Sequence, residues 1–402
     1  MKNNFIIRKL EKIFVYADNK FFYRFSQQRN FEDKLFIWFK NGIKNLNSFE
    51  YENLKRKTLS YVDSMSGEKK FLYKYSASGN TPTLYSSVYA CMIKSLFGEI
   101  QNLSETERRE WADYFNSHQN QDDGLFYDEA VNSEKYNSED YWGARHLAVH
   151  LLSCYAALKF KPKYKFSFIE DWYSFDFINK KLDSLDWGKR VHYTSNTVMN
   201  YCCILQYSRD FFNDTNAGKS IEYIHNWLLK KINIATGFWG DFIPQTPEEI
   251  SVLIQAAYHF LVVLLYDGIK ISSYKKIIDS ILLSQNKFFG FGVKLNSSAC
   301  EDIDSIDPLI RFSKMSDYKK TETAELIRNA LIWQFANMNN DGGFVFRREE
   351  PLIYGHLNMS SKINESAMFP TWFRILTIAY ISKFLNLKNN FIIGRSPGYE
   401  YV

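Results

Sequence analysis

The sequence predicts an all-α protein built as a single α/α toroid, and three observations lead to that prediction. Amphipathic and apolar stretches of helical length alternate along the chain. A short glycine-aromatic turn separates them at roughly fifty-residue intervals, a period that indicates stacked supersecondary units. Each unit has room for two helices and their loops, since helices usually span about 10–20 residues. The turns are Asp123–Phe126, Asp186–Gly188, Gly237–Gly240, Phe289–Gly292 and Asp341–Phe344.

The first element is an N-terminal amphipathic helical extension, predicted for residues 1–80. Apolar residues such as Phe5, Leu10 and Phe14 alternate there with Lys and Arg at helical spacing. A basic amphipathic helix can lie on a membrane surface, whereas such segments more often pack on their own domain. The run Gly79–Pro82 marks the boundary, and residues 81–402 are expected to form the toroid.

The toroid needs two concentric layers, and the sequence supplies both kinds of helix. The stretch Ala256–Leu265 is apolar nearly all round, as a helix covered on both sides must be. Outer helices are amphipathic, with Ile277 and Ile281 opposite Lys275, for example. About six inner helices are expected, near 83–98, 140–160, 194–212, 247–267, 302–316 and 364–386. Outer helices are expected near 105–119, 167–184, 217–232, 272–286 and 320–338.

Capping residues mark where these helices begin and end. Ser104 precedes one outer helix, and Pro247 with Glu248 opens one inner helix. The glycine of each turn permits a positive φ where an outer helix ends. We therefore expect hairpins joined tightly enough to close into a ring.

Composition narrows the class of protein. At 46% hydrophobic and 17% aromatic, the 402 residues can form a large core, which excludes disorder. The net charge of +5 is mild and no Lys/Arg-rich run occurs, so nucleic acid is not expected as a partner. The 5 Cys form no paired motif and suggest free thiols in a reducing compartment. With no signal-peptide pattern and no convincing membrane span, a cytoplasmic location is expected.

The turns resemble the repeat of the squalene–hopene cyclase, terpene cyclase and protein prenyltransferase superfamily. In that repeat a Gln on a helix precedes a Gly-aromatic turn, as Gln119 and Gln334 do here. A longer stretch, from Phe289–Gly292 through Asp302–Ser305 to Asp341–Phe344, is similar in layout to the second domain of squalene–hopene cyclases.

The resemblance implies that Asp304 is the acid that protonates an alkene or epoxide, with Asp302 as its aligned neighbour. Ser305 stands where the Asp-x-Asp-Asp motif of the family has its last Asp. Class II cyclases of the family work between two toroid-type domains, and this chain has the length for one.

The acidic cluster also suggests chemistry on its own terms. Glu301, Asp302, Asp304 and Asp307 lie within seven residues beside apolar sequence. Like charges and burial both favour the neutral acid, so at least one pKa should be raised, as a general acid requires. If Asp307 caps a helix opened by Pro308, the first two aspartates lie at the mouth of the toroid. The alternative is a solvated acidic helix start that offsets the helix dipole.

Polar and aromatic residues recur near the starts of the other inner helices. Trp142, Arg145 and His146 share a face by the i, i+3, i+4 rule. Each such residue alone is more often a satisfied core group, but their recurrence at one end of successive helices predicts a lined cavity. The candidate binding residues are Trp142, Arg145, His146, Asn196, Asn200, His259, Glu301, Phe369, Trp372 and Arg374.

No metal site is expected from the sequence. His146 and His150 have the i, i+4 spacing of a zinc helix, but Leu147 occupies the position of the catalytic Glu. No cofactor is predicted either, except Mg²⁺ if the substrate carries a diphosphate.

Three functions compete at this stage. The first, favoured by the Asp-x-Asp match, is a class II-like terpenoid cyclase (an isomerase or lyase) in which Asp304 initiates cyclisation of an isoprenoid. Its aromatic residues would stabilise cationic intermediates.

The alternative is a carbohydrate-active toroid enzyme, similar to uronyl hydrolases or lyases or modifying a glycan or nucleotide sugar. Asp302 and Asp304 would then form an acid/base pair, and Trp142 with Trp372 would stack on the sugar. Arg145 or Arg374 would grip a carboxylate or phosphate. A second alternative is a non-catalytic scaffold whose cavity is only packed core. The expected partner is thus a small isoprenoid or sugar, with peripheral membrane contact through the N-terminal segment left open.

Overall fold

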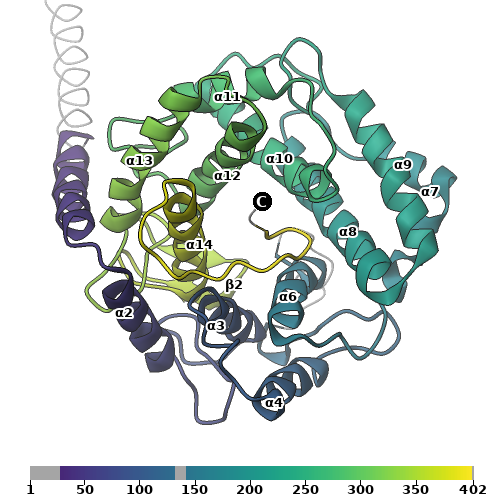
Figure 1. Cartoon of the computed structure of the whole chain (residues 1–402), viewed down its shortest axis with the longest axis horizontal. Helices are drawn as coiled ribbons and strands as arrows, with labels where there is room; N and C mark the ends of the chain where they lie inside the picture. Colours follow the sequence, from purple (N-terminus) through teal and green to yellow (C-terminus); the bar gives the residue numbers. More distant parts are fainter. Residues whose placement is uncertain (1–27, 132–141, 401–402) are drawn as a thin grey trace, which may run out of the picture.

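The computed structural model describes residues 28–131 and 142–400, and it confirms the single all-α toroid. Figure 1 looks down the axis of the ring, with an inner circle of helices surrounded by an outer one. The inner helices are α3 (Leu84–Leu96), α6 (Ala144–Leu158), α8 (Val191–Phe212), α10 (Pro247–Tyr266), α12 (Ala299–Met315) and α14 (Met368–Phe384). The outer layer holds α2 (Tyr51–Ser64), α4 (Glu105–Asn116), α7 (Phe175–Asp183), α9 (Thr215–Lys231), α11 (Tyr274–Leu283) and α13 (Lys320–Ala336).

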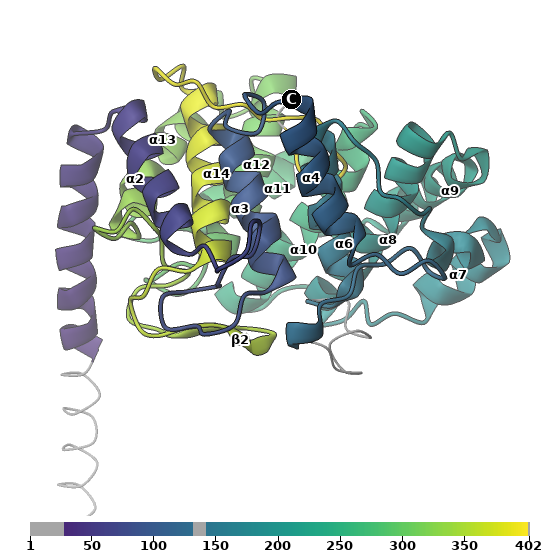
Figure 2. The same cartoon turned by 90° about the horizontal axis from the view of Figure 1, so that it is seen from below.

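The short elements lie in the connections. Two 3₁₀ helices, η1 (Glu129–Val131) and η2 (Ser167–Tyr173), precede α6 and α7. Strands β1 (Leu352–Tyr354) and β2 (His356–Ser361) pair antiparallel in a small hairpin between α13 and α14. Figure 2 shows this hairpin on one face of the toroid and the C-terminal segment at the opposite face.

The ring is closed rather than open. Each inner helix contacts its two neighbours in chain order, and α14 returns to pack on α3. The burial pattern explains the layering, because every residue of α14 from Met368 to Ser382 is buried. An outer helix such as α11 buries only one face, chiefly Ile277, Ile278 and Ile281. The apolar stripes and all-round apolar stretches of the sequence therefore sort the helices into the two layers.

The glycine-aromatic turns link one hairpin to the next as the repeat suggests. Gly342 has a φ of +91°, and a Cβ there would lie 2.2 Å from the backbone oxygen of Lys57. The Gln that precedes a turn bridges to the next unit, since the Gln119 amide nitrogen donates to the carbonyl oxygens of Gly124 (2.8 Å) and Tyr164 (2.9 Å). The turn therefore needs both a residue without a Cβ and an amide side chain.

The start of α12 differs from the expectation. Its N-cap is Ser298, whose side chain accepts from the backbone N–H of Glu301 while the Glu301 carboxylate accepts from Ser298. This reciprocal capping box is a stronger start signal than Asp307 before Pro308. Pro308 consequently lies inside the helix, and Asp307 is no cap but pairs with Arg311 at 2.9 Å. The acidic cluster thus occupies the first turns of a buried helix.

Among the described residues, α10 is long and apolar enough to cross a membrane by length and composition. Most of it is buried between α8 and α12, which is the environment of a core helix. Its apolar character therefore has an explanation within the ring.

The described part of the N-terminal extension packs on the outside of the toroid. A helix covers 28–47, and Leu35 on it is fully buried against Phe288 and Trp333. The Arg348 guanidinium lies 3.7 Å from the centre of the Trp38 ring. Residues 1–27 lie outside the described residues, so the membrane contact expected there stays a prediction. The domain boundary near residue 80 and the cytoplasmic location likewise stay predictions.

Candidate functional site

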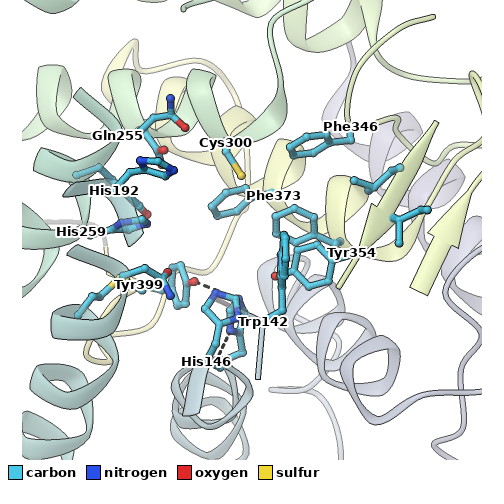
Figure 3. Close-up of a pocket in the computed structure, with 18 residues that line it drawn as sticks. Trp142, His146, His192, Gln255, His259, Cys300, Phe346, Tyr354, Phe373 and Tyr399 are labelled. Carbon is cyan, nitrogen blue, oxygen red and sulfur yellow. Dashed lines mark hydrogen bonds between the residues drawn. The ribbon is translucent and has the colours of Figure 1, made fainter. Parts of the chain in front are cut away.

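A pocket of about 210 Å³ lies inside the ring, near the amino ends of α6, α8, α12 and α14 and beside the middle of α10. Five of these helices each contribute two lining residues spaced i, i+4, which places both on one face of the helix. The pairs are His146 with His150, His192 with Asn196, Gln255 with His259, Cys300 with Asp304, and Phe369 with Phe373. Figure 3 shows side chains from these helices converging on the cavity. The remaining lining residues are Trp142, Met199, Tyr258, Phe346, Leu352, Ile353, Tyr354 and Tyr399.

One wall of the pocket is aromatic and includes the hairpin. The Tyr354 ring lies 4.4 Å from that of Phe369, and the Tyr354 hydroxyl is 3.1 Å from the Tyr89 hydroxyl. Gly355 has a φ of +74°, and a Cβ there would lie 2.9 Å from the Cβ of Trp142. The hairpin can approach Trp142 this closely only because residue 355 has no side chain. Figure 3 shows Trp142 and Tyr354 side by side.

The opposite wall carries imidazoles, and three of them, His146, His150 and His259, have side-chain hydrogen-bond partners. The Nδ1 atom of His146 is 2.9 Å from the Tyr85 hydroxyl. The Nδ1 atom of His150 donates to the His146 carbonyl at 2.8 Å, so its Nε2 accepts from the Tyr399 hydroxyl at 3.1 Å. Burial lowers the pKa of His150 to about 4 and that of His259 to about 3. Burial also lowers the pKa of His146, helped by the neighbouring His150. These three imidazoles are therefore neutral at physiological pH.

The hydrogen bonds of His259 allow a tautomer with a free Nε2. The Ser195 hydroxyl lies 2.9 Å from the His192 carbonyl oxygen and 2.9 Å from the Nδ1 of His259. When the hydroxyl donates to the carbonyl, it accepts from Nδ1, and the proton of this imidazole is on Nδ1. Its Nε2 carries a lone pair, which suits a hydrogen-bond acceptor or a base.

Asp304 has an environment of a different kind. It is 3% exposed and lines the pocket, and its carboxyl group forms no hydrogen bond or ion pair with any residue in 28–131 or 142–400. Burial raises the pKa of Asp304 well above its usual value, and the charges of Glu301, Asp307 and Asp302 raise it further. These effects favour the neutral form of the Asp304 carboxyl group, which is the form that can donate a proton.

Asp302 occupies a structural position instead. Its carboxylate is fully buried and forms an ion pair with Arg374 at 2.9 Å. It also accepts from Gln334 at 3.1 Å, from the backbone of Phe291 at 2.9 Å and from Ser297 at 2.7 Å. All its acceptor positions are thus directed at the joint between α12, α13 and α14. It does not line the pocket.

The structure brings together only part of the candidate set from the sequence. Trp142, His146, Asn196, His259, Phe369 and Asp304 line the pocket. The others lie elsewhere, and most are engaged in the frame. Glu301 caps α12 and binds Arg347, Arg374 binds Asp302, and the Arg145 guanidinium lies 5.8 Å from the centre of the Tyr201 ring. Asn200 is fully buried, and Trp372 stacks on Tyr89 behind the pocket wall. Their roles in substrate binding stay predictions.

Several pocket residues were not among the candidates. His192 and Cys300 each lie one helical turn before a candidate, so extending the i, i+4 rule backwards could have found them. Tyr354 and Tyr399 come from a hairpin and an irregular segment, where no helical period exists to reveal them. Within the described ranges, no group of three or more His, Cys, Asp or Glu is arranged to hold a metal ion.

Comparisons with known proteins give a distant likeness and no family. No protein-family model and no curated protein matches the chain. Among solved structures, a GH76 α-mannanase of Bacteroides thetaiotaomicron matches with a TM-score of 0.45 and 13% identity, over 86% of this chain and 99% of that chain. A likeness this weak carries no argument about activity.

The favoured expectation of a terpenoid cyclase is nevertheless wrong. The pocket gives a physical reason, because its polar wall of imidazole, amide and carboxyl groups is unlike the hydrocarbon chamber expected for an isoprenoid. Asp302, the expected neighbour of the acid, forms a buried ion pair with Arg374. The Asp-x-Asp spacing therefore arises from one structural and one pocket aspartate on the same helix.

Proposed function

We propose that this protein is a carbohydrate-active enzyme that cleaves the glycosidic bond of a neutral sugar with acid assistance. The observation that carries the proposal is Asp304, a buried acid with a raised pKa that lines a pocket with one aromatic and one polar wall. No cofactor is needed for this reaction.

The two walls suit a sugar ring. Trp142, Tyr354 and Phe369 present aromatic faces and edges on which the apolar side of a pyranose can lie. Asn196 and Gln255 stand opposite with amide groups that can donate to and accept from hydroxyls. A pocket with convergent polar groups on an apolar surface is the usual form of a small-molecule site.

The proposed chemistry begins with proton transfer from Asp304 to the glycosidic oxygen as the bond to the anomeric carbon breaks. A water molecule forms the new bond to that carbon and gives a proton to the Nε2 of a neutral imidazole, a role we assign to His259 with its own proton on Nδ1. Solvent then returns a proton to Asp304 and removes one from the imidazole.

Most glycosidases use two carboxyl groups for these roles. The expected pair of Asp302 and Asp304 is unsuitable, because the Asp302 carboxylate is bound by Arg374 and directed away from the pocket. Asp304 is the one carboxyl group among the described lining residues, so an imidazole takes the place of the second.

A neutral sugar fits better than a uronide or a nucleotide sugar. Arg374, expected to grip an anion, is neutralised by Asp302 outside the pocket. The described lining holds a protonated acid, neutral imidazoles and amides, which match hydroxyl groups. An anionic substrate would enter this buried site without a paired charge, which is costly.

The test compares aryl glycosides of neutral hexoses with the corresponding uronides. Asp304→Asn should lower kcat/KM by about 10²–10⁴-fold for a poor leaving group such as methylumbelliferone. The loss should be much smaller for 2,4-dinitrophenol, a leaving group that needs no acid. Asp317→Asn, at a side chain that is 93% exposed, is the matched control and should change neither rate. Full activity in Asp304→Asn, or turnover of uronides alone, contradicts the proposal.

A further inference from the structure

The segment that follows α14 runs across the centre of the ring of inner helices, as Figure 1 shows. We call residues 387–400 the strap. It lies at the carboxyl ends of the inner helices, opposite the β1–β2 hairpin in Figure 2. The strap forms no regular helix or strand, yet its last residues, from Ser396 to Glu400, are all buried.

The strap lies against all six inner helices and forms hydrogen bonds with five of them. Its Ile392 N–H donates to Leu96 of α3 at 2.9 Å, and Ser396 bonds Ser153 of α6 at 2.6 Å. A Cβ on Gly398 would lie 3.5 Å from the sulfur of Cys203 in α8. Arg395 donates to the carbonyl of Tyr266 in α10 at 3.1 Å. The Glu400 carbonyl accepts from Arg311 of α12 at 2.8 Å and from Tyr380 of α14 at 3.0 Å.

A buried ion-pair chain fixes the end of the strap. Arg311 is held by Asp307 at 2.9 Å and also contacts the Glu400 carboxylate at 3.4 Å, with all three side chains nearly inaccessible. Asp307 and Arg311 of α12 thus hold Glu400, the residue that follows Tyr399, in place. Removing one partner of such a chain would leave a buried charge unpaired, so the strap is held firmly.

Tyr399 forms the inner end of the pocket. Its hydroxyl bonds the Nε2 of His150 at 3.1 Å, and its ring lies edge-on to Trp372 with centres 5.0 Å apart. The same side chain lines a second, mostly apolar cavity of about 150 Å³ on the strap side. Among the described residues, Tyr399 is the one side chain that lines both cavities.

We propose that the strap makes the pocket blind, so that the protein accepts the terminal sugar of a chain and releases it as a monosaccharide. The inference rests on the proposed function and specifies its substrate. A glycan cleaved internally must extend through the site in both directions, and Tyr399 blocks one of them. The cavity of about 210 Å³ is also smaller than the ~300–1,000 Å³ of sites for larger ligands. This size suits a single sugar ring.

The first test is the product pattern of the wild-type protein. For each neutral sugar whose aryl glycoside is cleaved, the protein is incubated with the linear oligosaccharides and the polysaccharide of that sugar. Early products are separated by anion-exchange chromatography, and the viscosity of the polysaccharide is followed. We expect monosaccharide alone and unchanged viscosity. Early release of oligosaccharides, or a fall in viscosity, overturns the inference and leaves the proposed function standing. If no sugar probe is cleaved, both fall.

The second test removes the end wall. Tyr399→Ala joins the pocket to the cavity behind it, so KM for the aryl monosaccharide should rise roughly tenfold through loss of aromatic contact. Disaccharide should appear among the products. Ile392→Ser is the matched control, since Ile392 belongs to the strap and lines only the second cavity. It should keep the wild-type pattern. An unchanged KM and product pattern in a folded Tyr399→Ala protein contradicts the role of Tyr399.

Discussion

Replacing Asp304 or Asp302 by Asn should change the stability of the protein in opposite directions, although the two residues lie on the same turn of α12. Asp304 is buried without a partner among the described residues, and its pKa is raised well above the usual value. Asp302 is equally buried but is paired with Arg374. Asp304→Asn therefore removes a destabilising buried acid, whereas Asp302→Asn removes a stabilising ion pair.

The pH dependence of the Asp304 effect can be worked out from linkage. Above an unfolded pKa of about 3.9, the unfolded chain has lost the proton while the folded protein keeps it. The free energy of unfolding then falls by about 1.4 kcal/mol per pH unit until the folded pKa is reached, and is constant above it. Asp304→Asn cannot titrate, so its stability relative to wild type should rise with pH over that window.

Asp302→Asn leaves the Arg374 guanidinium buried without its counter-charge. Breaking a buried pair in this way costs about 3–5 kcal/mol. With 402 residues, an unfolding entropy of ~2.1 cal/mol/K per residue converts this into a fall in Tm of about 4–6 °C. The same conversion gives the Asp304→Asn protein a relative gain of about 1.7 °C per pH unit.

The assay is thermal unfolding, followed by circular dichroism, of wild type and both variants between pH 4.5 and 8. The difference in Tm between Asp304→Asn and wild type should grow as pH rises, and Asp302→Asn should unfold below wild type throughout. A pH-independent difference for Asp304→Asn would refute the reasoning, because it would mean that the carboxyl group is ionised in the folded protein across the whole range.

Three further predictions follow from the site and the turns. The kcat/KM profile should stay high at mildly acidic pH, because burial lowers the pKa of His259 to about 3. It should fall as pH rises through the raised pKa of Asp304, because the acid is then lost. A loss of kcat/KM below pH ~6.5, the pKa of an ordinary histidine, contradicts this prediction. Trp142→Ala should raise KM for the aryl glycoside more than it lowers kcat, in steady-state kinetics, since a stacking residue binds ground and transition states alike. Gly342→Ala should lower the urea midpoint of unfolding further than Gly268→Ala. Both glycines have a positive φ, so each alanine carries a backbone strain of ~1–2 kcal/mol. Only the alanine at position 342 also places a Cβ against the Lys57 backbone. Equal midpoints would remove the close approach as a cause.

The sequence was sufficient to predict the ring and most of its helices. Local signals account for this success, because a turn that needs glycine and a helix that is apolar all round are both visible within one stretch of chain. The N-terminal bound of α12 was missed because the capping box of Ser298 and Glu301 competed with the more conspicuous Asp307–Pro308 pair. Here too the deciding signal was local and could have been found.

The site was predicted only where helical spacing exposes it. His146, Asn196 and His259 share a face with other polar residues, and all three line the pocket. The distinction between Asp302 and Asp304 was beyond sequence reasoning, because the partner of Asp302 is 72 residues away on α14. Nothing in a pattern of charges indicates which carboxylate will be neutralised by a distant arginine.

The closure of the ring between α14 and α3 has a consequence for folding kinetics. Open repeat arrays can nucleate anywhere and propagate, since each unit touches only its neighbours. In this protein α3 lacks one of its two inner neighbours until α14 arrives nearly 300 residues later in synthesis. An emerging chain therefore exposes the apolar edge of α3 until α14 has been synthesised. Such long-range pairing slows folding and leaves the growing chain open to aggregation.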